Sequence, residues 1–254
     1  MAISSLEALS IPEESREQFQ GYLRDLKKFF QRNVEALILY GSAVRGDFIE
    51  GRSNLNLLVV VGTLSVQVIQ QAGALHAKGG KHHIVPPLLM TLDEIKRSCS
   101  VYPLEWLLMQ ESHVLLEGRD PFPELHIPLQ SLGWHCEREI NSHVLQVRQR
   151  LIEAEARPDA VQSIIILSIT ALLPILRGLF RVLNYSSRGT DMEILERLPQ
   201  VLDYHSTGLL DALKLKRGMR GPGVLEWFKV YGQYLDALME LTGRVQDLRG
   251  KGRL

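Results

Sequence analysis

Hydrophobic and polar residues in the first half of the chain follow the patterns of both helices and strands. Over residues 14–33 the apolar positions recur every three or four residues, which predicts a helix that Ser15 caps. Residues 34–40 and 55–61 are continuous apolar runs, and each run ends at a glycine. Unbroken hydrophobicity in so short a run is typical of a strand that is covered on both faces.

Weaker signals complete this half. Residues 64–77 are compatible with a helix, residues 83–90 with a third strand, and residues 113–116 with an edge strand. The pair Pro86-Pro87 favours an edge position or a bend for the third strand. Thr91-Leu92-Asp93-Glu94 has the form of a capping box that opens a short helix. We therefore expect an α+β unit in which a short mixed sheet has flanking helices.

The second half is patterned almost entirely for helices. Helical spacing of apolar residues covers four segments, with Gly221-Pro222-Gly223 breaking the chain before the last: residues 131–156, 160–183, 192–204 and 224–248. Short connections between helices predict an antiparallel, all-α helical bundle.

A stretch rich in proline separates the two halves. Residues 118–128, GRDPFPELHIP, combine three prolines with a glycine, a composition typical of a loop or linker. We expect domains at residues 1–120 and 129–254, joined by a linker at residues 121–128. The length of 254 residues agrees with two domains.

Composition narrows the class of protein. Hydrophobic residues make up 45% of the chain and charged residues 23%, which is ordinary for a globular protein with a sizeable core. Lys+Arg and Asp+Glu both number 29, so the formal net charge is zero. This balance argues against a dedicated nucleic-acid-binding protein, which carries a broad basic surface.

Cysteine usage and targeting signals indicate a cytoplasmic protein. Cys99 and Cys136 are too few for a disulfide framework or a four-thiolate zinc site, so we expect free, buried thiols in a reducing compartment. The N-terminal residues lack the basic start and apolar run of a signal peptide. Residues 161–176 contain no charged residue but are shorter than the roughly 20 residues of a bilayer span. We interpret them as a buried central helix and expect no membrane partner.

The most informative segment is residues 37–61, LILYGSAVRGDFIEGRSNLNLLVVV. Its first strand ends at Gly41, whose missing side chain lets a phosphate group approach the backbone. The amides at the start of the following helix favour an anion, and Ser42 and Arg45 add donors. Strand alternation places Asn54 and Asn56 on one side of the returning strand, facing the loop. These residues predict a phosphate-binding loop.

This segment resembles the signature of the polymerase-β-like nucleotidyltransferase superfamily. That signature is Gly-Ser, then Arg-Gly, then Ser-Asp-x-Asp leading into an apolar strand; the residues that match it are Gly41, Ser42, Arg45, Gly46 and Ser53. By layout the chain is most similar to small bacterial nucleotidyltransferases with a helical C-terminal domain, the aminoglycoside adenylyltransferase type included. The resemblance implies that Gly41, Ser42, Arg45 and Ser53 bind a nucleotide.

The resemblance also implies a metal-dependent reaction that this sequence does not support. In the family two aspartates hold divalent ions, usually magnesium, and a carboxylate on a later strand completes the site. Here Asn54 and Asn56 occupy the aspartate positions, and residues 83–90 contain no acid. Asparagine keeps a carbonyl oxygen but loses the charge that holds magnesium. We therefore expect no protein-held metal and little or no transfer of a nucleoside monophosphate.

Three hypotheses about function stay open. The leading one is a catalytically impaired pseudoenzyme that binds nucleotide or phosphate through Gly41-Ser42, with a nucleoside triphosphate and magnesium as the candidate cofactors. The second is an active nucleotidyltransferase with relocated acids, for which Asp47, Glu50, Asp93 and Glu94 are the nearby candidates. The third is a non-enzymatic scaffold that binds a protein partner or a second copy of itself. Loop acids are usually solvated, which argues against the second hypothesis.

Other polar clusters have simpler interpretations. His135, Glu139 and His143 share one helix face and could bind zinc, but we expect that face to be solvated or at a boundary. Lys81-His82-His83 is interpreted as a solvated strand entry. Arg177 and Arg181 end the apolar helix, where the helix dipole favours cations, although they could also face a cleft.

Overall fold

The structure is a computed structural model, and it describes residues 9, 11–51, 53–79, 83–204, 207–218 and 226–254. The chain forms two compact units, Met1–Ile127 and Pro128–Leu254. Residues 121–127, which we expected to be a linker, belong to the first unit, where Phe122 and Leu125 are buried. The short helix η2 (Phe122–Glu124) turns these side chains toward the sheet.

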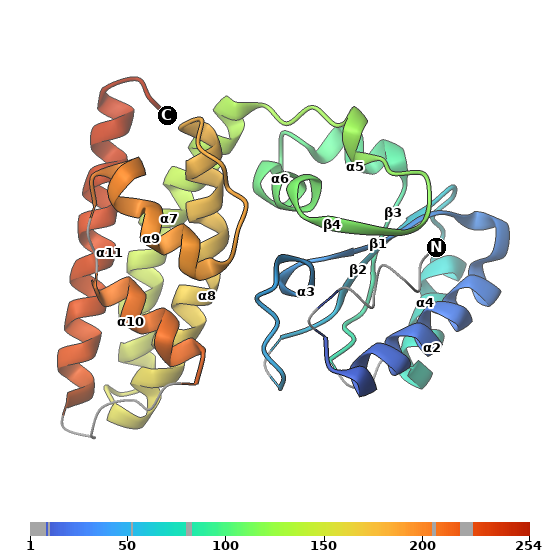
Figure 1. Cartoon of the computed structure of the whole chain (residues 1–254), viewed down its shortest axis with the longest axis horizontal. Helices are drawn as coiled ribbons and strands as arrows, with labels where there is room; N and C mark the ends of the chain where they lie inside the picture. Colours follow the sequence, from blue (N-terminus) through green and yellow to red (C-terminus); the bar gives the residue numbers. More distant parts are fainter. Residues whose placement is uncertain (1–8, 10, 52, 80–82, 205–206, 219–225) are drawn as a thin grey trace. The chain divides into compact units, whose positions relative to one another are not determined.

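The first unit is built on a four-stranded sheet in the order β3-β2-β1-β4 (Figure 1). The strands are β1 (Val34–Tyr40), β2 (Asn56–Val61), β3 (Leu88–Met90) and β4 (His113–Gly118). β1 is antiparallel to β2 and to β4, whereas β2 and β3 are parallel. The sheet is therefore mixed, as the sequence predicted, and the two continuous apolar runs form its central strands.

Alternate residues of the central strands face two separate cores. Leu37 and Leu39 of β1 pack with α2 (Glu13–Phe30) and α4 (Val66–Gly79), whereas Ala36 and Ile38 pack on the other side. That second face is covered by α5 (Leu92–Ser98), α6 (Pro103–Glu111) and η2. Figure 1 shows the two helix layers on opposite faces. Burial on both faces explains why these strands lack polar alternation.

Three details of this unit differ from the predictions. The third strand covers only Leu88–Met90 at the sheet edge, and Ile84 joins the sheet through a single bridge to Leu55. Ser15 is buried inside α2, and Pro12 occupies the N-cap position with no capping side chain among the described residues, so the predicted serine cap was wrong. The helix α6 was not predicted, because its residues are apolar on several sides and lack a helical period.

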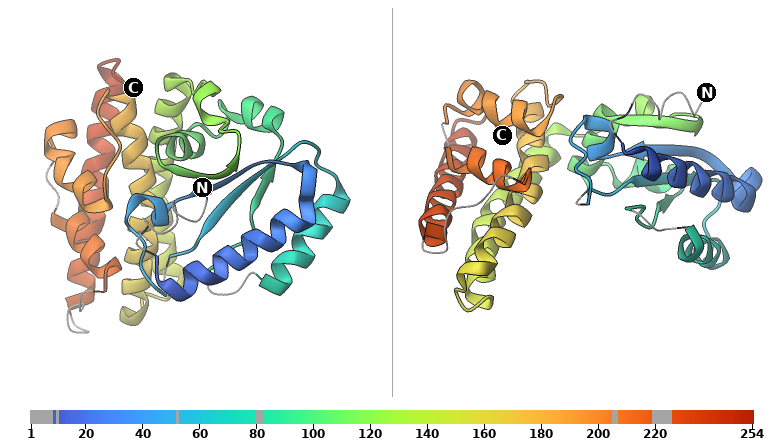
Figure 2. Two further views of the ribbon diagram at one scale, coloured as in Figure 1. Left: turned by 45° about the vertical axis from the view of Figure 1, so that its right-hand side comes forward. Right: turned by 60° about the horizontal axis from the view of Figure 1, so that its bottom comes forward.

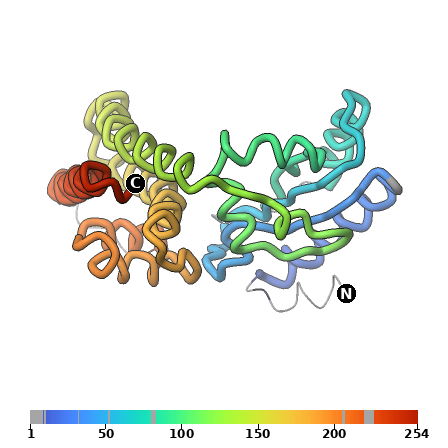
Figure 3. Tube along the Cα trace, turned by 90° about the horizontal axis from the view of Figure 1, so that it is seen from above, coloured from blue at the N-terminus to red at the C-terminus, as the bar shows by residue number. Residues whose placement is uncertain are grey.

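The second unit is a bundle of helices among the described residues (Figure 2). They are α7 (Leu129–Glu153), α8 (Pro158–Val182), α9 (Asp191–Leu202), α10 (Thr207–Lys216) and α11 (Trp227–Gly250). The long helices α7, α8 and α11 pack against one another. Seen from above, the end of the chain beyond α11 lies on the side of that helix that faces the other helices of the bundle (Figure 3). The predicted break at Gly221-Pro222-Gly223 lies outside the described residues, as do Lys81 and His82 of the predicted basic cluster.

The apolar helix α8 lies at the centre of this bundle. It is long and apolar enough to cross a membrane by length and composition, but 67% of its most apolar window is buried inside the protein. Contacts with α7, α9, α10 and α11 account for that burial. The hydrophobicity of α8 is thus explained as that of a core helix, as predicted. Both cysteines, Cys99 and Cys136, are free and buried, also as predicted.

Arg177 belongs to a buried ionic network inside the helical unit. Its guanidinium donates to the carbonyl oxygens of Ser187 and Gly189, both at 2.8 Å, and to Asp191 Oδ1 at 2.8 Å. Lys216 Nζ donates to the other oxygen of Asp191 at 3.0 Å. Arg177 therefore connects α8 to α9 within the core and does not line a cleft, whereas Arg181 is exposed.

His143 is a second buried polar residue that the sequence pattern placed wrongly. We expected the face with His135 and Glu139 to be solvated or at a boundary, but His143 is 6% exposed. Its Nε2 lies 2.7 Å from Ser168 Oγ, which in turn lies 2.7 Å from the hydroxyl of Tyr234. This network joins α7, α8 and α11. Among the described residues, no three His, Cys, Asp or Glu side chains form a group that could hold a metal ion.

Candidate functional site

The candidate site lies where β1 ends and β2 begins. These strands are antiparallel neighbours, and Tyr40 is paired with Asn56, so both ends of the loop reach the same edge of the sheet. Gly41 follows Tyr40 with φ 94° and ψ −154°, a conformation that favours glycine. A Cβ atom built on Gly41 would lie 2.6 Å from Nδ2 of Asn56. The carboxamide of Asn56 therefore rests directly against the backbone of the loop.

The short helix α3 (Ser42–Arg45) follows Gly41 and is a single turn. The amides of Val44 and Arg45 both donate to the Gly41 carbonyl, at 3.2 and 3.3 Å. The first amides of a helix, here those of Ser42 and Ala43, have no carbonyl partner within the helix. A helix of one turn contributes little macrodipole, so these individual amides matter more than the helix dipole that the sequence interpretation invoked.

Gly46 ends α3 and directs the next residue inward. It has a left-handed conformation, with φ 78° and ψ 15°, and the amide of Asp47 donates to the Ser42 carbonyl at 3.0 Å. The Asp47 side chain is only 3% exposed, and its Oδ2 lies 3.8 Å from Nε of Arg45, whose side chain is 19% exposed. We expected a solvated loop acid at Asp47, and that expectation was wrong, because the turn at Gly46 buries the carboxylate beneath the helix.

Ser53 shapes the second half of the loop. Its hydroxyl accepts a hydrogen bond from the Ile49 amide at 2.8 Å, and its own amide donates to the Ile49 carbonyl at 2.8 Å. These two bonds close a compact turn directly before Asn54. The oxygen of the Ser53 side chain is thus used to hold the loop.

Asn54 and Asn56 occupy unequal environments. Asn54 is exposed and precedes Leu55, which bonds to the His83 carbonyl at 2.7 Å and forms the bridge to Ile84. Asn56 is half-buried as the first residue of β2. The amide of Asn56 thus has a fixed place beside Gly41, whereas Asn54 projects from the sheet edge into solvent.

The remaining candidate acids have structural roles or exposed positions. The capping box opening α5 formed as predicted: the Thr91 hydroxyl accepts from the Glu94 amide, and the Glu94 carboxylate accepts from the Thr91 amide at 2.8 Å. That hydrogen bond from the Thr91 backbone is the main cause lowering the pKa of Glu94. Asp93 and Glu50 are exposed. β3 consists of Leu88, Leu89 and Met90, so it offers no acid to the site.

Comparison with known proteins supports the fold. No family model matches this chain, and no curated protein matches it in sequence. Among solved structures, the spectinomycin adenyltransferase AAD(9) from Enterococcus faecialis, determined with ATP and spectinomycin, is similar with a TM-score of 0.55 at 15% sequence identity. The match covers 91% of this chain and 98% of that protein. At this identity the likeness shows the fold, which is that of a nucleotidyltransferase with a helical C-terminal region.

Proposed function

We propose that this nucleotidyltransferase-fold protein binds the phosphate groups of a nucleoside triphosphate at the Gly41-Ser42 loop without needing a divalent metal ion. We further propose that its transfer of a nucleoside monophosphate is strongly impaired. The observation that carries both statements is the neutral carboxamide of Asn56 resting against the Gly41 backbone. In the sequence signature that this loop resembles, a metal-binding aspartate occupies that position.

The charge at the loop decides whether a metal is needed. Two carboxylates beside a triphosphate repel it, by about 4 kcal/mol per pair of unit charges 4 Å apart at a typical protein-surface dielectric, unless a cation lies between them. Asn54 and Asn56 remove that repulsion, and each carboxamide adds N–H donors while it keeps one carbonyl acceptor. Together with the first amides of α3 and the hydroxyl of Ser42, the carboxamide of Asn56 forms a set of donors that suits a phosphate.

The same substitutions argue against efficient catalysis. Magnesium is held in such sites by carboxylates together with substrate phosphates, and it supplies the charge that stabilises the transition state. Loss of one positioned electrostatic group commonly lowers kcat by roughly 10²–10³-fold. With both signature acids replaced and no acid in β3, we expect transfer to be near the uncatalysed level.

One observation favours a nucleotide as the ligand, and another favours the cytosol as the location. The solved protein of similar fold, AAD(9), was determined with ATP, which makes ATP the first nucleotide to test. The free, buried thiols of Cys99 and Cys136 agree with a reducing compartment.

The active-enzyme alternative has one specific observation in its favour. Asp47 is a buried carboxylate in the loop itself, and buried acids often have chemical roles. Asp47 lies 3.8 Å from Arg45, a cation that balances its charge within the loop, and the described residues form no group of three or more potential metal ligands around it. We therefore favour a structural role for Asp47.

Calorimetric titration with ATP in EDTA tests binding. We expect saturable binding that Ser42→Ala weakens by about tenfold, the effect of losing one hydrogen bond to a charged phosphate. Ser100→Ala is the matched control, because Ser100 is an exposed serine of the same unit outside the loop. Absence of any ATP affinity would favour the scaffold hypothesis and overturn the proposal.

Incubation with each labelled nucleoside triphosphate, in magnesium or manganese, tests catalysis. We expect no transfer above the protein-free rate. Metal-dependent transfer that is abolished by Ser42→Ala and by Asp47→Asn would show instead that an acid of this loop has taken over the metal site.

A further inference from the structure

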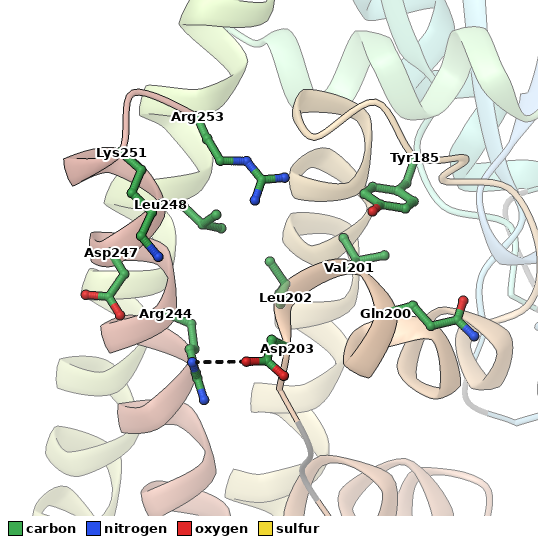
Figure 4. A pocket seen from close by; sticks show the side chains of 10 residues that line it. All are labelled: Tyr185, Gln200, Val201, Leu202, Asp203, Arg244, Asp247, Leu248, Lys251 and Arg253. Atoms are coloured by element: carbon green, nitrogen blue, oxygen red, sulfur yellow. Dashed lines mark ion pairs between the residues drawn. The ribbon is translucent and has the colours of Figure 1, made fainter.

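The helical unit contains a cavity of about 230 Å³ at the point where three helices end (Figure 4). Its walls come from the C-terminal turns of α9 and α11, from Tyr185 just after α8, and from Lys251 and Arg253 just after α11. All the lining residues belong to this unit. The lining residues are far from the Gly41 loop in sequence, and none of them takes part in the function proposed above.

Arg253 is held over the cavity by the way in which α11 ends. Gly252 has φ 64°, its amide donates to the Arg249 carbonyl at 2.9 Å, and the Arg253 amide donates to the Leu248 carbonyl at 2.9 Å. This pair of bonds is the Schellman motif, which turns the chain back across the helix end. As Figure 4 shows, the guanidinium of Arg253 consequently points into the space between the helices.

A second Schellman motif, at the end of α8, places Tyr185 across the cavity from Arg253. Asn184 has φ 63°, its amide donates to the Arg181 carbonyl at 3.1 Å, and the Tyr185 amide donates to the Phe180 carbonyl at 2.7 Å. Arg197 then holds the loop that follows, through the carbonyls of Ser186 and Arg188 at 2.9 and 2.8 Å. The backbone that carries Tyr185 is therefore held in place, and its ring lines the cavity.

The charges around the cavity favour an anion. Arg244 has a carboxylate partner, since its Nη1 lies 3.6 Å from Asp203 Oδ2. For Lys251 and Arg253 no ion pair is found among the described residues. In Figure 4 the carboxylate of Asp247 points away from the guanidinium of Arg253. Arg253 thus points into the cavity, while Lys251 lines it just after α11, near Asp247.

Part of the cavity wall is apolar, beside its polar and charged lining. Val201, Leu202 and Leu248 line it, and all three are buried side chains. An inorganic anion would leave this surface without contacts, whereas a ring or short alkyl body would cover it. The two cations match a group of charge about −2, and arginine recognises phosphate through parallel hydrogen bonds.

We propose that this cavity, the Arg253 cavity, binds a small organic phosphate monoester. Lys251 and Arg253 hold its phosphate, while Tyr185 and the apolar part of the wall contact its body. The competing role for the cations is to balance the partial negative charge of the helix ends. In the Schellman motif, however, the last carbonyls of α11 already accept backbone hydrogen bonds, which reduces that need.

Calorimetric titration of the full chain with phenyl phosphate tests the proposal, because its ring and phosphate fit the two halves of the cavity. We expect a dissociation constant of about 1 mM or below, weakened about tenfold or more by Arg253→Gln, as for loss of a hydrogen bond between charged groups. Lys229→Gln is the matched control, an exposed cation on α11 outside the cavity. Ser42→Ala should leave this affinity unchanged, which separates the cavity from the Gly41 loop.

Three outcomes would overturn the proposal. The first is no saturable binding up to about 10 mM phenyl phosphate. The second is an affinity for phenyl phosphate that Arg253→Gln leaves unchanged. If the same variant also has a lowered Tm, the role of Arg253 is to balance the charge of the helix end. The third is equal affinity for inorganic phosphate, which would remove any role for the apolar part of the wall. A far-ultraviolet circular dichroism spectrum like that of the native chain confirms that each variant is folded.

Discussion

The two units treat a buried ion pair differently. In the helical unit both ions of the pair are buried within the core, whereas in the loop of the α+β unit the cation is partly exposed to solvent. Arg177 and Asp191 have side chains that are 2% and 5% exposed, and their atoms meet at 2.8 Å. Arg45 and Asp47 lie 3.8 Å apart, and the Arg45 side chain is 19% exposed. The first arrangement satisfies the ions with protein groups, and the second places a wider ion pair near the surface of the candidate loop.

This difference predicts which variants change stability and which change binding. Burial alone would raise the pKa of Asp191, but Lys216 and Arg177 hold that pKa below the ordinary aspartate value. Asp191 is thus charged at neutral pH and needs both cations. We expect substitutions in this network to unfold the helical unit, and substitutions in the loop to affect ligand affinity more than stability.

The largest expected effect is that of Arg177→Met. Removing the guanidinium takes one buried cation away from Asp191 and leaves the Ser187 and Gly189 carbonyls without this donor, which should lower the free energy of unfolding by about 3–5 kcal/mol. Arg181→Met, one turn away and exposed, should change it by less than about 0.5 kcal/mol. Urea denaturation measures both, and equal losses would contradict the structural role of Arg177.

Gly41→Ala should have a mixed effect. The positive φ costs about 1–2 kcal/mol for alanine, and the new Cβ must displace the Asn56 carboxamide. Gly51→Ala is the matched control, because Gly51 has φ 74° but no atom within 4 Å of an added Cβ. We expect the larger stability loss, measured by urea denaturation, for Gly41→Ala, because only there does the new Cβ displace a side chain, and weaker ATP binding for that variant only. Equal ATP affinity in both would separate Asn56 from the ligand.

The stabilising effect of helix capping can be tested in both units. Thr91 caps α5 and Thr190 caps α9, each in a capping box with the glutamate three residues later. Thr→Ala at either position should cost about 1 kcal/mol of unfolding free energy, whereas Thr→Ser should cost little. A loss confined to one of the two variants would show that the box in the other unit is not formed.

The smallest expected effect concerns pH. Burial is the main cause lowering the pKa of His143 below its ordinary value of 6.5, so folding favours the neutral ring. The unfolded chain then binds the proton more readily, and stability present above about pH 6.5 is lost as the pH falls toward the lowered folded-state pKa. His143→Gln should flatten this part of the curve of unfolding free energy against pH. An unchanged slope would mean that His143 does not titrate differently on folding.

Local patterns predicted most of the fold correctly. The run from Val34 to Tyr40 became β1 with both ends as predicted, because a β-branched apolar run bounded by glycine has few alternatives. The predictions failed where the burial of a residue depends on partners that are distant in the sequence. His143 is buried because Ser168 and Tyr234, on two other helices, complete its hydrogen bonds. No periodicity within residues 131–156 contains that information.

The candidate site could be predicted where it depends on local sequence patterns. Gly41, Asn56 and the strand ends that carry them follow from the strand–loop–strand pattern. The burial of Asp47 does not, although Gly46 directly before it was a usable signal, since a glycine in the left-handed conformation often ends a helix and turns the chain. The Arg253 cavity depends on three helix ends that meet only in the folded protein.

The most direct test of the central claim is ATP titration, with magnesium and with EDTA, of the native chain and of Asn54→Asp/Asn56→Asp. We predict that the native chain binds ATP about equally in both conditions. The double variant should bind about tenfold or more weakly in EDTA and recover with magnesium, because restored carboxylates repel the triphosphate until a cation bridges them. Magnesium-dependent binding by the native chain, or a double variant indifferent to magnesium, would contradict the account.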